Sequence, residues 1–256
     1  DLSTASFTYP TTDYFAISVA EEPYPTGLFF KPDGTKMYIV GTFGDDINEY
    51  SLSSAWDITT ASYVQNFSVA AEDIVPHGLF FKPDGTKMYI IGQIDDDVIE
   101  YSLSSAWDIS TARTFKTLAS PRKSLYPPGV FFKPDGTKMY IIGYGNDAVV
   151  EYSLSTGWDI STASYVQGFG VQARDTTPRS IFFKDDGTTM YMLGDTNDAV
   201  YEYSLSSAWD ISTASYVQNF GLRRMIYAPR DLFFKPNGKK MYITGLGPSA
   251  VIAFSL

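Results

Sequence analysis

The chain contains no cysteine and only one histidine, His77. It therefore forms no disulfide and offers no thiolate, and a lone histidine without cysteine argues against a zinc site. No stretch approaches 18 apolar residues, and the sequence opens at Asp1 without a basic and apolar leader. We therefore expect neither a membrane span nor a signal peptide, and no metal or cofactor. The compartment stays open, with extracellular and virion-associated locations both compatible with the composition.

Basic residues are also scarce. The chain has 19 Lys and Arg against 29 Asp and Glu, a formal net charge of -10. This charge repels nucleic acid and anionic lipid, so we predict no nucleic-acid partner. By contrast, aromatic residues are abundant, with 19 Tyr and 18 Phe, which is typical of a β-rich globular protein. We expect the protein to be a monomer.

One phrase recurs five times at a constant spacing. FFKPDGTKMY begins at Phe29, Phe80 and Phe131, FFKDDGTTMY at Phe182, and FFKPNGKKMY at Phe233. Each start lies 51 residues after the previous one. A fixed period of this length indicates a single supersecondary unit repeated along the chain.

The second copy shows what the unit is. Residues 76–85 predict a strand that ends in a Pro-Asp-Gly turn, and residues 86–92 predict the strand that pairs with it. VIEYSL and TARTFKTL follow as a third and a fourth strand. Four short antiparallel strands per unit are typical of a propeller blade, and the 3.6-residue period of helical repeats is absent. The turn glycines should have positive φ; they are Gly34, Gly85, Gly136, Gly187 and Gly238.

The two ends of the chain complement each other. The sequence DLSTAS at residues 1–6 matches DISTAS at residues 210–215, while the last copy stops at Ser255-Leu256, before its fourth strand. We therefore expect Asp1 to about Tyr9 to pair with the strand that ends at Leu256. An open stack would instead need polar caps, which are not visible. The sequence predicts an all-β, five-bladed propeller of 51-residue, four-stranded blades, forming a single domain over residues 1–256.

The units resemble the YVTN and NHL type of propeller repeat. Each begins with a proline and a strand, continues with PDG and then MYI or MYV, and ends with an Asn/Asp turn and a YSL strand. They are most similar to arrays of the form DGTKMY…EYSLSSAWDISTAS, found in bacterial and phage-associated sequences without an assigned role. The resemblance implies the propeller fold. It carries over no catalytic or binding residue, because such propellers share architecture and not chemistry.

Sequence variation is concentrated on one face of the predicted ring. KPDGTK and YSLSSAWDISTAS recur nearly unchanged, whereas the segments that precede each blade differ; these are residues 20–24, 71–75, 122–126, 173–177 and 224–228. The residue after each proline differs as well. Loops on a rigid scaffold commonly carry binding residues, so we take this variable face as the candidate functional face, with unconstrained drift as the alternative.

Arginines are gathered on the variable face, where six of the seven fall in or beside the variable segments. Arginine suits contact with carboxylate, sulfate or phosphate, although pairing with nearby aspartates is the simpler alternative. We predict a ligand at the channel mouth, held chiefly by Arg179 and Arg230. The other candidate ligand-binding residues are Arg174, Arg224, Tyr227, His77, Tyr126 and Asp231.

Two other repeated residue types are interpreted as scaffold. The tryptophans at one repeat position are expected to cover the edge between neighbouring blades, and the aspartates of the Asp-rich turns are expected to form those turns. No catalytic or metal-binding residue is assigned, because no P-loop, dinucleotide fingerprint or nucleophile elbow is present.

Three functions are compatible with the sequence. The favoured hypothesis is a non-catalytic, lectin-like carbohydrate-binding module for a glycan or another anionic polymer. The first alternative is a structural or interaction component of a phage particle or cell surface. The second is a glycoside hydrolase with its site at the channel mouth, which needs paired carboxylates where the innermost strands offer only Asp231. An enzyme was less favoured because no blade diverges beyond its loops.

Overall fold

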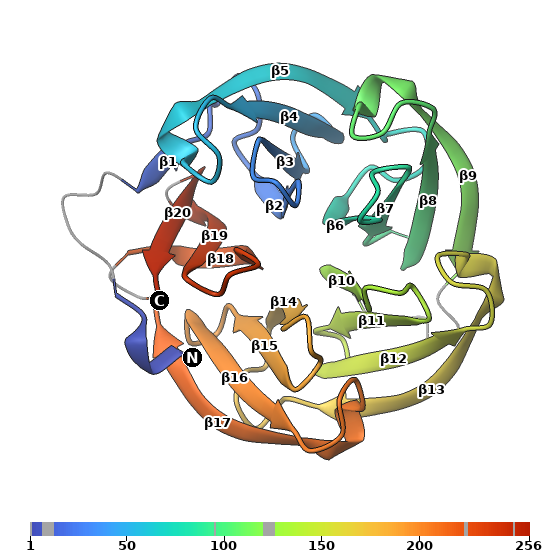
Figure 1. The fold of residues 1–256 in the computed structure, drawn as a ribbon, viewed down its shortest axis with the longest axis vertical. Helices are drawn as coiled ribbons and strands as arrows, with labels where there is room; N and C mark the ends of the chain where they lie inside the picture. The colour runs from blue at the N-terminus through green and yellow to red at the C-terminus, as the bar shows by residue number, and fades with distance from the viewer. Residues whose placement is uncertain (1, 7–12, 95, 120–125, 223–224, 248) are drawn as a thin grey trace.

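The computed structural model shows a closed ring of five four-stranded antiparallel sheets around a central channel (Figure 1). In the part of the chain that it describes, the only helical segments are short 3-10 turns. The prediction of an all-β, five-bladed propeller is therefore confirmed. The described residues are 2–6, 13–94, 96–119, 126–222, 225–247 and 249–256.

Each blade begins with its innermost strand and ends at the rim. Blade 1 consists of β2 (Pro25–Phe30), β3 (Lys36–Gly41), β4 (Asp46–Leu52) and β5 (Ala61–Ser68). Blade 2 consists of β6 (Pro76–Phe81), β7 (Lys87–Gly92), β8 (Asp97–Leu103) and β9 (Ala112–Ala119). Blade 3 consists of β10 (Gly129–Phe132), β11 (Lys138–Gly143), β12 (Ala148–Leu154) and β13 (Ala163–Gly170). Blade 4 consists of β14 (Pro178–Phe183), β15 (Thr189–Gly194), β16 (Ala199–Leu205) and β17 (Ala214–Gly221).

Blade 5 combines the two ends of the chain. It consists of β18 (Tyr227–Phe234), β19 (Lys240–Gly247) and β20 (Ser249–Ser255), with β1 (Tyr14–Ala16) as its outermost strand. The expected closure is present, but the pairing strand lies further along the chain than predicted. Residues 2–4 form a 3-10 turn, η1 (Leu2–Thr4), and only Ser6 of the predicted segment bridges to β20, at Ser255. Asp1 and residues 7–9 of that segment lie outside the described residues.

The reason for this shift is visible in the other blades. A 3-10 turn precedes the outer strand in each of blades 1 to 4: η2 (Ile58–Thr60), η3 (Ile109–Thr111), η4 (Ile160–Thr162) and η5 (Ile211–Thr213). An aspartate caps each of these turns by accepting a hydrogen bond from the backbone N–H two residues later. The DLSTAS segment keeps the same register, so it forms the turn and not the strand.

The hairpin glycines adopt the predicted conformation. The φ angles of Gly34, Gly85, Gly136, Gly187 and Gly238 lie between 68° and 74°. In four of the blades the glycine also provides room for the tryptophan ring. A Cβ on Gly85, for example, would lie 2.4 Å from the Trp107 ring. These positions therefore require glycine both for the left-handed backbone and for the close approach of the indole.

Hydrogen bonds to the tryptophan backbone join neighbouring blades. The Tyr38 hydroxyl and the Lys36 ammonium of blade 1 both donate to the carbonyl oxygen of Trp107 in blade 2, at 2.8 and 2.9 Å. Lys36 also donates to the buried Glu49 carboxylate at 2.5 Å. Equivalent bonds join blades 2 and 3 and blades 3 and 4. The tryptophan side chains are buried, which agrees with the expected scaffold role.

One phenylalanine from each blade closes the channel toward the invariant face. These five rings contact one another edge to face, with centroid separations of 5.2 to 5.5 Å and interplanar angles of 65° to 74°. We call them the phenylalanine ring; its members are Phe29, Phe80, Phe131, Phe182 and Phe233. The ring separates the variable-face end of the channel from a cavity of about 740 Å³ at the invariant face, which the same five phenylalanines and the hairpin residues line.

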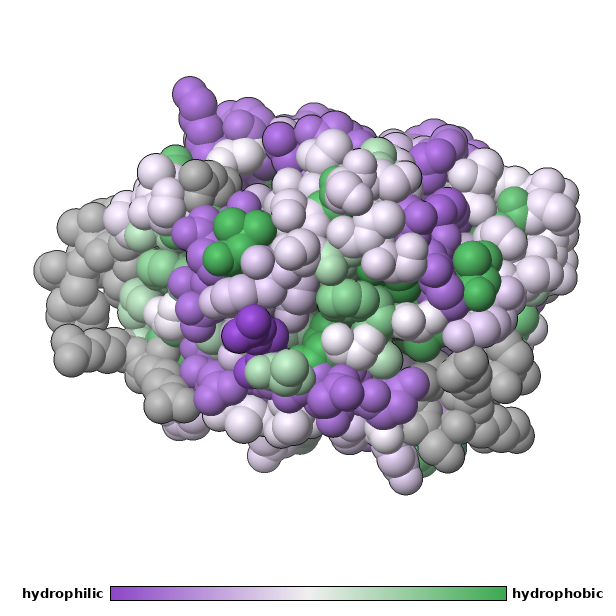
Figure 2. Space-filling model, turned by 90° about the horizontal axis from the view of Figure 1, so that it is seen from below, coloured by the Kyte–Doolittle hydropathy of each residue, from purple (hydrophilic) through white to green (hydrophobic). Residues whose placement is uncertain are grey.

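The outer surface of the disc carries no single large apolar patch in the view of Figure 2. Hydrophobic residues there form small groups among hydrophilic and intermediate ones. Among the described residues, no helix has the length and apolar character that crossing a bilayer would require.

We expect that deleting residues 1–16 will strongly destabilise the protein. The deletion removes β1 and η1, which exposes the edge of β20 and the contact between η1 and β17. A loss of a few kcal/mol corresponds to a fall of about 5 to 10 °C in the melting temperature of a domain of this size. Thermal denaturation followed by circular dichroism measures this change. An unchanged melting curve would contradict the closure.

Candidate functional site

The channel mouth is built by a repeated β-bulge. In the innermost strands of blades 2, 4 and 5, the register shifts across the residue that follows the proline. A bulge adds one unpaired residue and turns its side chain in a new direction. The residues at this position are His77, Arg179 and Arg230, and the same position in blade 1 is Thr26. Three of the predicted ligand-binding residues are thus brought to the mouth by one backbone device.

Two arginines converge on one carboxylate. The Arg179 Nε and Nη2 atoms donate to Asp195 Oδ2 at 3.0 and 2.7 Å, and Arg230 Nη1 donates to the same oxygen at 2.6 Å. The side chains of both arginines are only 15% exposed. Charge-assisted bonds of this kind hold the guanidinium planes firmly. The cluster keeps an excess of one positive charge at the mouth.

The histidine is tied into the same cluster through a glutamine. His77 Nε2 lies 2.8 Å from Gln93 Oε1, and the Gln93 amide donates to the Tyr144 hydroxyl. The Arg179 guanidinium lies over the Tyr144 ring, 5.0 Å from its centroid. The Tyr126 ring also stacks on Tyr144, with a centroid separation of 5.5 Å. His77, Tyr126 and Arg179 therefore belong to one contiguous set of contacts.

Burial keeps the imidazole neutral. It lowers the pKa of His77 to about 4, and the positive charges of Arg179 and Arg230 act in the same direction, while the bond to Gln93 opposes them. Because the Gln93 oxygen can only accept, His77 carries its proton on Nε2 and keeps a lone pair on Nδ1.

Three members of this cluster are not among the predicted ligand-binding residues, although the alternative in which the arginines pair with a nearby aspartate describes Asp195 correctly. Gln93, Tyr144 and Asp195 occupy one repeat position, directly after the glycine that ends the second strand of blades 2, 3 and 4. This position differs in every blade, and the position after the proline varies as well, with arginine in blades 4 and 5. The signal was therefore present, but only the pairing of the two positions across the channel, which requires the fold, shows that they form a single site.

Asp231 lies beneath the mouth. It follows Arg230 on β18 and is only 8% exposed. Its Oδ2 accepts a hydrogen bond from the Leu28 backbone at 2.6 Å, and its Oδ1 accepts one from the Leu232 backbone at 2.8 Å and another from the Ser180 hydroxyl. Burial raises the pKa of Asp231 to about 7, although these donors favour the charged form.

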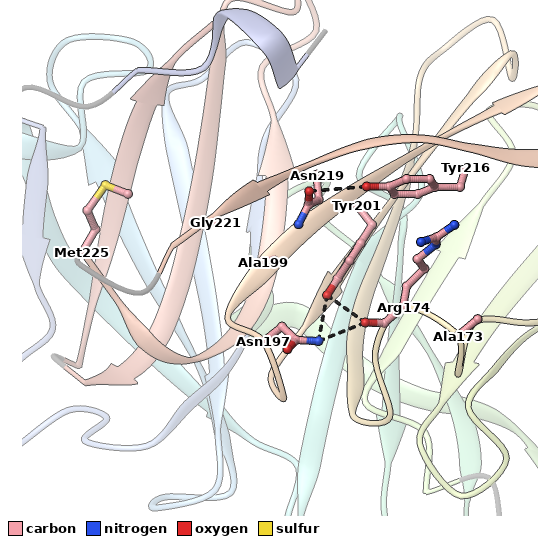
Figure 3. Close-up of a pocket in the computed structure, with 9 residues that line it drawn as sticks. All are labelled: Ala173, Arg174, Asn197, Ala199, Tyr201, Tyr216, Asn219, Gly221 and Met225. Carbon is pink, nitrogen blue, oxygen red and sulfur yellow. Dashed lines mark hydrogen bonds between the residues drawn. The ribbon is translucent and has the colours of Figure 1, made fainter.

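Arg174 is placed away from the mouth cluster. Its guanidinium lies 3.8 Å from the centroid of Tyr216, on the outer strand β17, and it lines an open pocket of about 650 Å³ at the edge of blade 4 (Figure 3). The Tyr201 hydroxyl and the Asn197 amide both donate to its carbonyl oxygen. Tyr227 is 66% exposed on β18, and Arg224 lies outside the described residues.

Acidic residues of the variable face serve mainly to shape its loops. Asp175 accepts hydrogen bonds from the backbone N–H groups of Thr177, Thr196 and Asn197, which joins the loop before β14 to the loop after β15. Glu22 makes the corresponding bonds in blade 1. In the described ranges, no group of three or more His, Asp or Glu residues is arranged to hold a metal ion.

We expect His77 to remain neutral well below the ordinary histidine range, because burial disfavours the charged imidazolium and because protonation would add a positive charge beside Arg179 and Arg230. As the only histidine, it gives a single imidazole signal, so NMR titration of this signal measures its pKa directly. The midpoint should lie near 4. A midpoint near 6.5 would contradict this account.

The raised pKa of Asp231 predicts a specific pH dependence of stability. Its pKa in the folded state, about 7, exceeds the ordinary value of 3.8. The folded state therefore favours the protonated carboxyl, and this stabilisation is lost as the pH rises from 4 through 7.

Asp231→Gly, which introduces the residue found in blades 1 to 3, removes this linkage. Between pH 4 and pH 8 the free energy of unfolding of the wild type should fall, relative to the variant, by roughly 4 kcal/mol. Urea denaturation at several pH values measures the difference. Parallel pH profiles would show that Asp231 titrates normally.

Solved structures of similar fold include proteins named as gluconolactonases. The Pseudomonas aeruginosa periplasmic gluconolactonase PpgL aligns with 14% identity and a TM-score of 0.55, over 92% of this chain and 67% of that one. A Bacteroides uniformis protein with a provisional 6-phosphogluconolactonase assignment aligns with 15% identity and a TM-score of 0.56, over 89% of this chain. A Bacteroides fragilis protein with the same provisional assignment aligns with 14% identity and a TM-score of 0.58, over 93% of this chain and 82% of that one.

These likenesses concern the fold. This chain spans 65% of the length of the Bacteroides uniformis protein. No curated protein sequence matches it.

A family model does match the sequence. Residues 21–208, well over half of the chain, match the model described as "Lactonase, 7-bladed beta-propeller", although this chain has five blades. The prediction of a non-catalytic, lectin-like, carbohydrate-binding and phage-associated module is therefore wrong, and its structural and glycoside hydrolase alternatives fall with it. It failed because the near-identity of the blades was taken as evidence against catalysis. The match shows that this chain belongs to the lactonase family of β-propellers.

Proposed function

We propose that the protein is a lactonase that hydrolyses a sugar lactone at the channel mouth. The observation that carries the proposal is the lactonase family match over residues 21–208. The propellers of similar fold that are named as gluconolactonases support a sugar lactone as the substrate class. The mouth cluster supplies the polar groups that such a substrate needs.

The reaction places specific demands on the site. A water oxygen attacks the acyl carbon, the ester bond to the ring oxygen breaks, and the ring oxygen leaves as a hydroxyl. The product is an open-chain hydroxy acid, and one proton is released at neutral pH. The site must therefore stabilise negative charge on the carbonyl oxygen, hold the sugar hydroxyls and accept the proton of the water.

The arginine pair suits the first demand. Arg179 and Arg230 are fixed by Asp195 and carry an excess positive charge in a partly buried setting. Guanidinium N–H groups that are held in place stabilise the charge that develops on the carbonyl oxygen without first having to reorganise. The same charge also attracts a substrate that carries a phosphate group.

The remaining mouth residues suit the second demand. His77 is neutral, with a free Nδ1 acceptor, and is oriented by Gln93, so it can accept a hydrogen bond from a sugar hydroxyl. Tyr126 and Tyr144 present stacked rings beside it, against which a pyranose face could pack. The phenylalanine ring separates this mouth from the cavity at the invariant face, so a substrate bound at the mouth enters and leaves by the variable face.

Activity is measured as proton release from glucono-1,5-lactone and from its 6-phosphate, with spontaneous hydrolysis subtracted. We expect the wild type to hydrolyse at least one of them. Arg230→Ala should lower kcat/KM by about 100-fold or more, since it removes one donor to the developing oxyanion. Lys184→Ala is the matched control, because this lysine is a well-exposed cation on the opposite face, and it should leave the rate unchanged.

The two possible failures have different meanings. If both lactones are hydrolysed only at the spontaneous rate in the presence of the protein, the proposed activity is contradicted. An Arg230→Ala variant with wild-type kcat/KM would leave the proposed activity standing. It would show that the arginine pair does not take part in catalysis.

A further inference from the structure

The position of Asp231 breaks the symmetry of the propeller. The equivalent residues in blades 1 to 3 are Gly27, Gly78 and Gly129, and in blade 4 the residue is Ser180. A Cβ on Gly27 would lie 2.4 Å from the His77 carbonyl oxygen in the next blade. Side chains at this position therefore point into the blade interface beside the channel. Three blades close without any side chain there, so a carboxylate is not a requirement of the fold.

The carboxyl of Asp231 has room for one more hydrogen bond. A carboxylate offers about four acceptor positions. Three are occupied, by the Leu28 and Leu232 backbone N–H groups and by the Ser180 hydroxyl. Two of these donors approach Oδ1 and one approaches Oδ2, so the remaining position is on Oδ2.

A small cavity lies beside this carboxyl. It has a volume of about 20 Å³ and is lined by Asp231, by residues of the innermost strands and by the phenylalanine ring. This volume suits a single water molecule. The cavity is too small for a sugar ring.

Backbone N–H groups also face this cavity. The pairing of β6 with β7 places Gly78 and Phe80 at the positions hydrogen-bonded to the partner strand, so the N–H group of Leu79 points the other way, toward the channel. The same register applies to Val130 and Ile181. In blades 5 and 1 the corresponding N–H groups, those of Leu232 and Leu28, are the ones that bond Asp231.

From this arrangement we propose that one water molecule is held between Asp231 Oδ2 and the channel N–H groups, and that the Asp231 carboxylate accepts its proton as it attacks the lactone. The inference rests on the proposed lactonase function. The water oxygen forms the new bond to the acyl carbon and its proton passes to Asp231. The proton then returns to the ring oxygen as the ester bond breaks, so the carboxylate is regenerated.

The mouth offers no better proton acceptor. His77 has a pKa of about 4 and is a weak base at neutral pH. Asp195 Oδ2 already accepts three hydrogen bonds from two guanidinium groups. Asp231 has a pKa of about 7, close to the value at which a general base is most effective. Two charged side chains adjoin it along the strands: Arg230 precedes it on β18, and Arg179 precedes its partner Ser180 on β14.

The pH dependence of kcat tests the proton transfer. In the wild type, kcat on the lactone that is hydrolysed should fall below about pH 7, because the base must be ionised. Asp231→Asn should lower kcat by about 100-fold or more, with little change in KM. It should also abolish the fall of kcat below pH 7, which is the acid limb of the pH profile. Asp185→Asn, on the opposite face, is the matched control and should behave as the wild type.

Ser180→Gly provides a second variant that should fold, because glycine occupies this position in blades 1 to 3. It removes one donor to the Asp231 carboxylate, so the acid limb should move to higher pH by roughly half a unit or more. A role limited to packing would not move this limb. An unshifted limb in Ser180→Gly, or near wild-type kcat in a folded Asp231→Asn variant, would overturn the proposal.

A crystal structure of the wild type at pH 8 tests the water site without an activity assay. Electron density for a water within hydrogen-bonding distance of Asp231 Oδ2 and a channel N–H group is expected, and an empty cavity would overturn the inference. An inactive wild type would defeat the lactonase proposal and the base role together. In that case the crystal structure would still decide whether the water is held.

Discussion

The edge-to-face packing of five phenylalanines around one axis is the contact on which the rest of the structure depends. Each ring touches the rings of both neighbouring blades, at centroid separations of 5.2 to 5.5 Å. This geometry fixes how closely the innermost strands approach the axis and blocks the channel between its two ends. It thereby separates the variable-face opening, around which the bulged residues His77, Arg179 and Arg230 lie, from the cavity at the invariant face.

Burial is the dominant electrostatic effect at this opening. It depresses the pKa of His77 and raises that of Asp231, so both groups favour their neutral forms far more than they would in water. The arginine pair remains charged but shares one counterion, Asp195. The channel mouth thus combines a neutral acceptor, His77, with a fixed positive centre, the arginine pair. A carboxyl that titrates near neutrality, that of Asp231, lies beneath them. This combination suits hydrolysis of an ester in a ring better than it suits retention of a polyanion.

The lactonase family match also changes how the repeats are understood. Near-identical blades do not argue against catalysis, because the catalytic candidates need only three variable positions per blade. Two are the first and second residues after the proline of the first strand, and the third follows the glycine of the second strand. The scaffold residues can stay constant while these three positions change. This chain has five blades, whereas the family model describes seven.

The sequence by itself determined the period, the blade count, the ring closure and the positive φ of the hairpin glycines, because each follows from local pattern and from comparison among repeats. It also identified Arg179, Arg230, His77, Tyr126 and Asp231 as candidates. Only the tertiary structure decided which of them meet. Arg174 stacks on Tyr216 at the rim, although it lies close to Arg179 in the chain. The roles of Gln93 and Asp195 follow from contacts across the channel, and the shifted pKa values follow from burial. Both depend on how separate blades pack together, which no local pattern encodes.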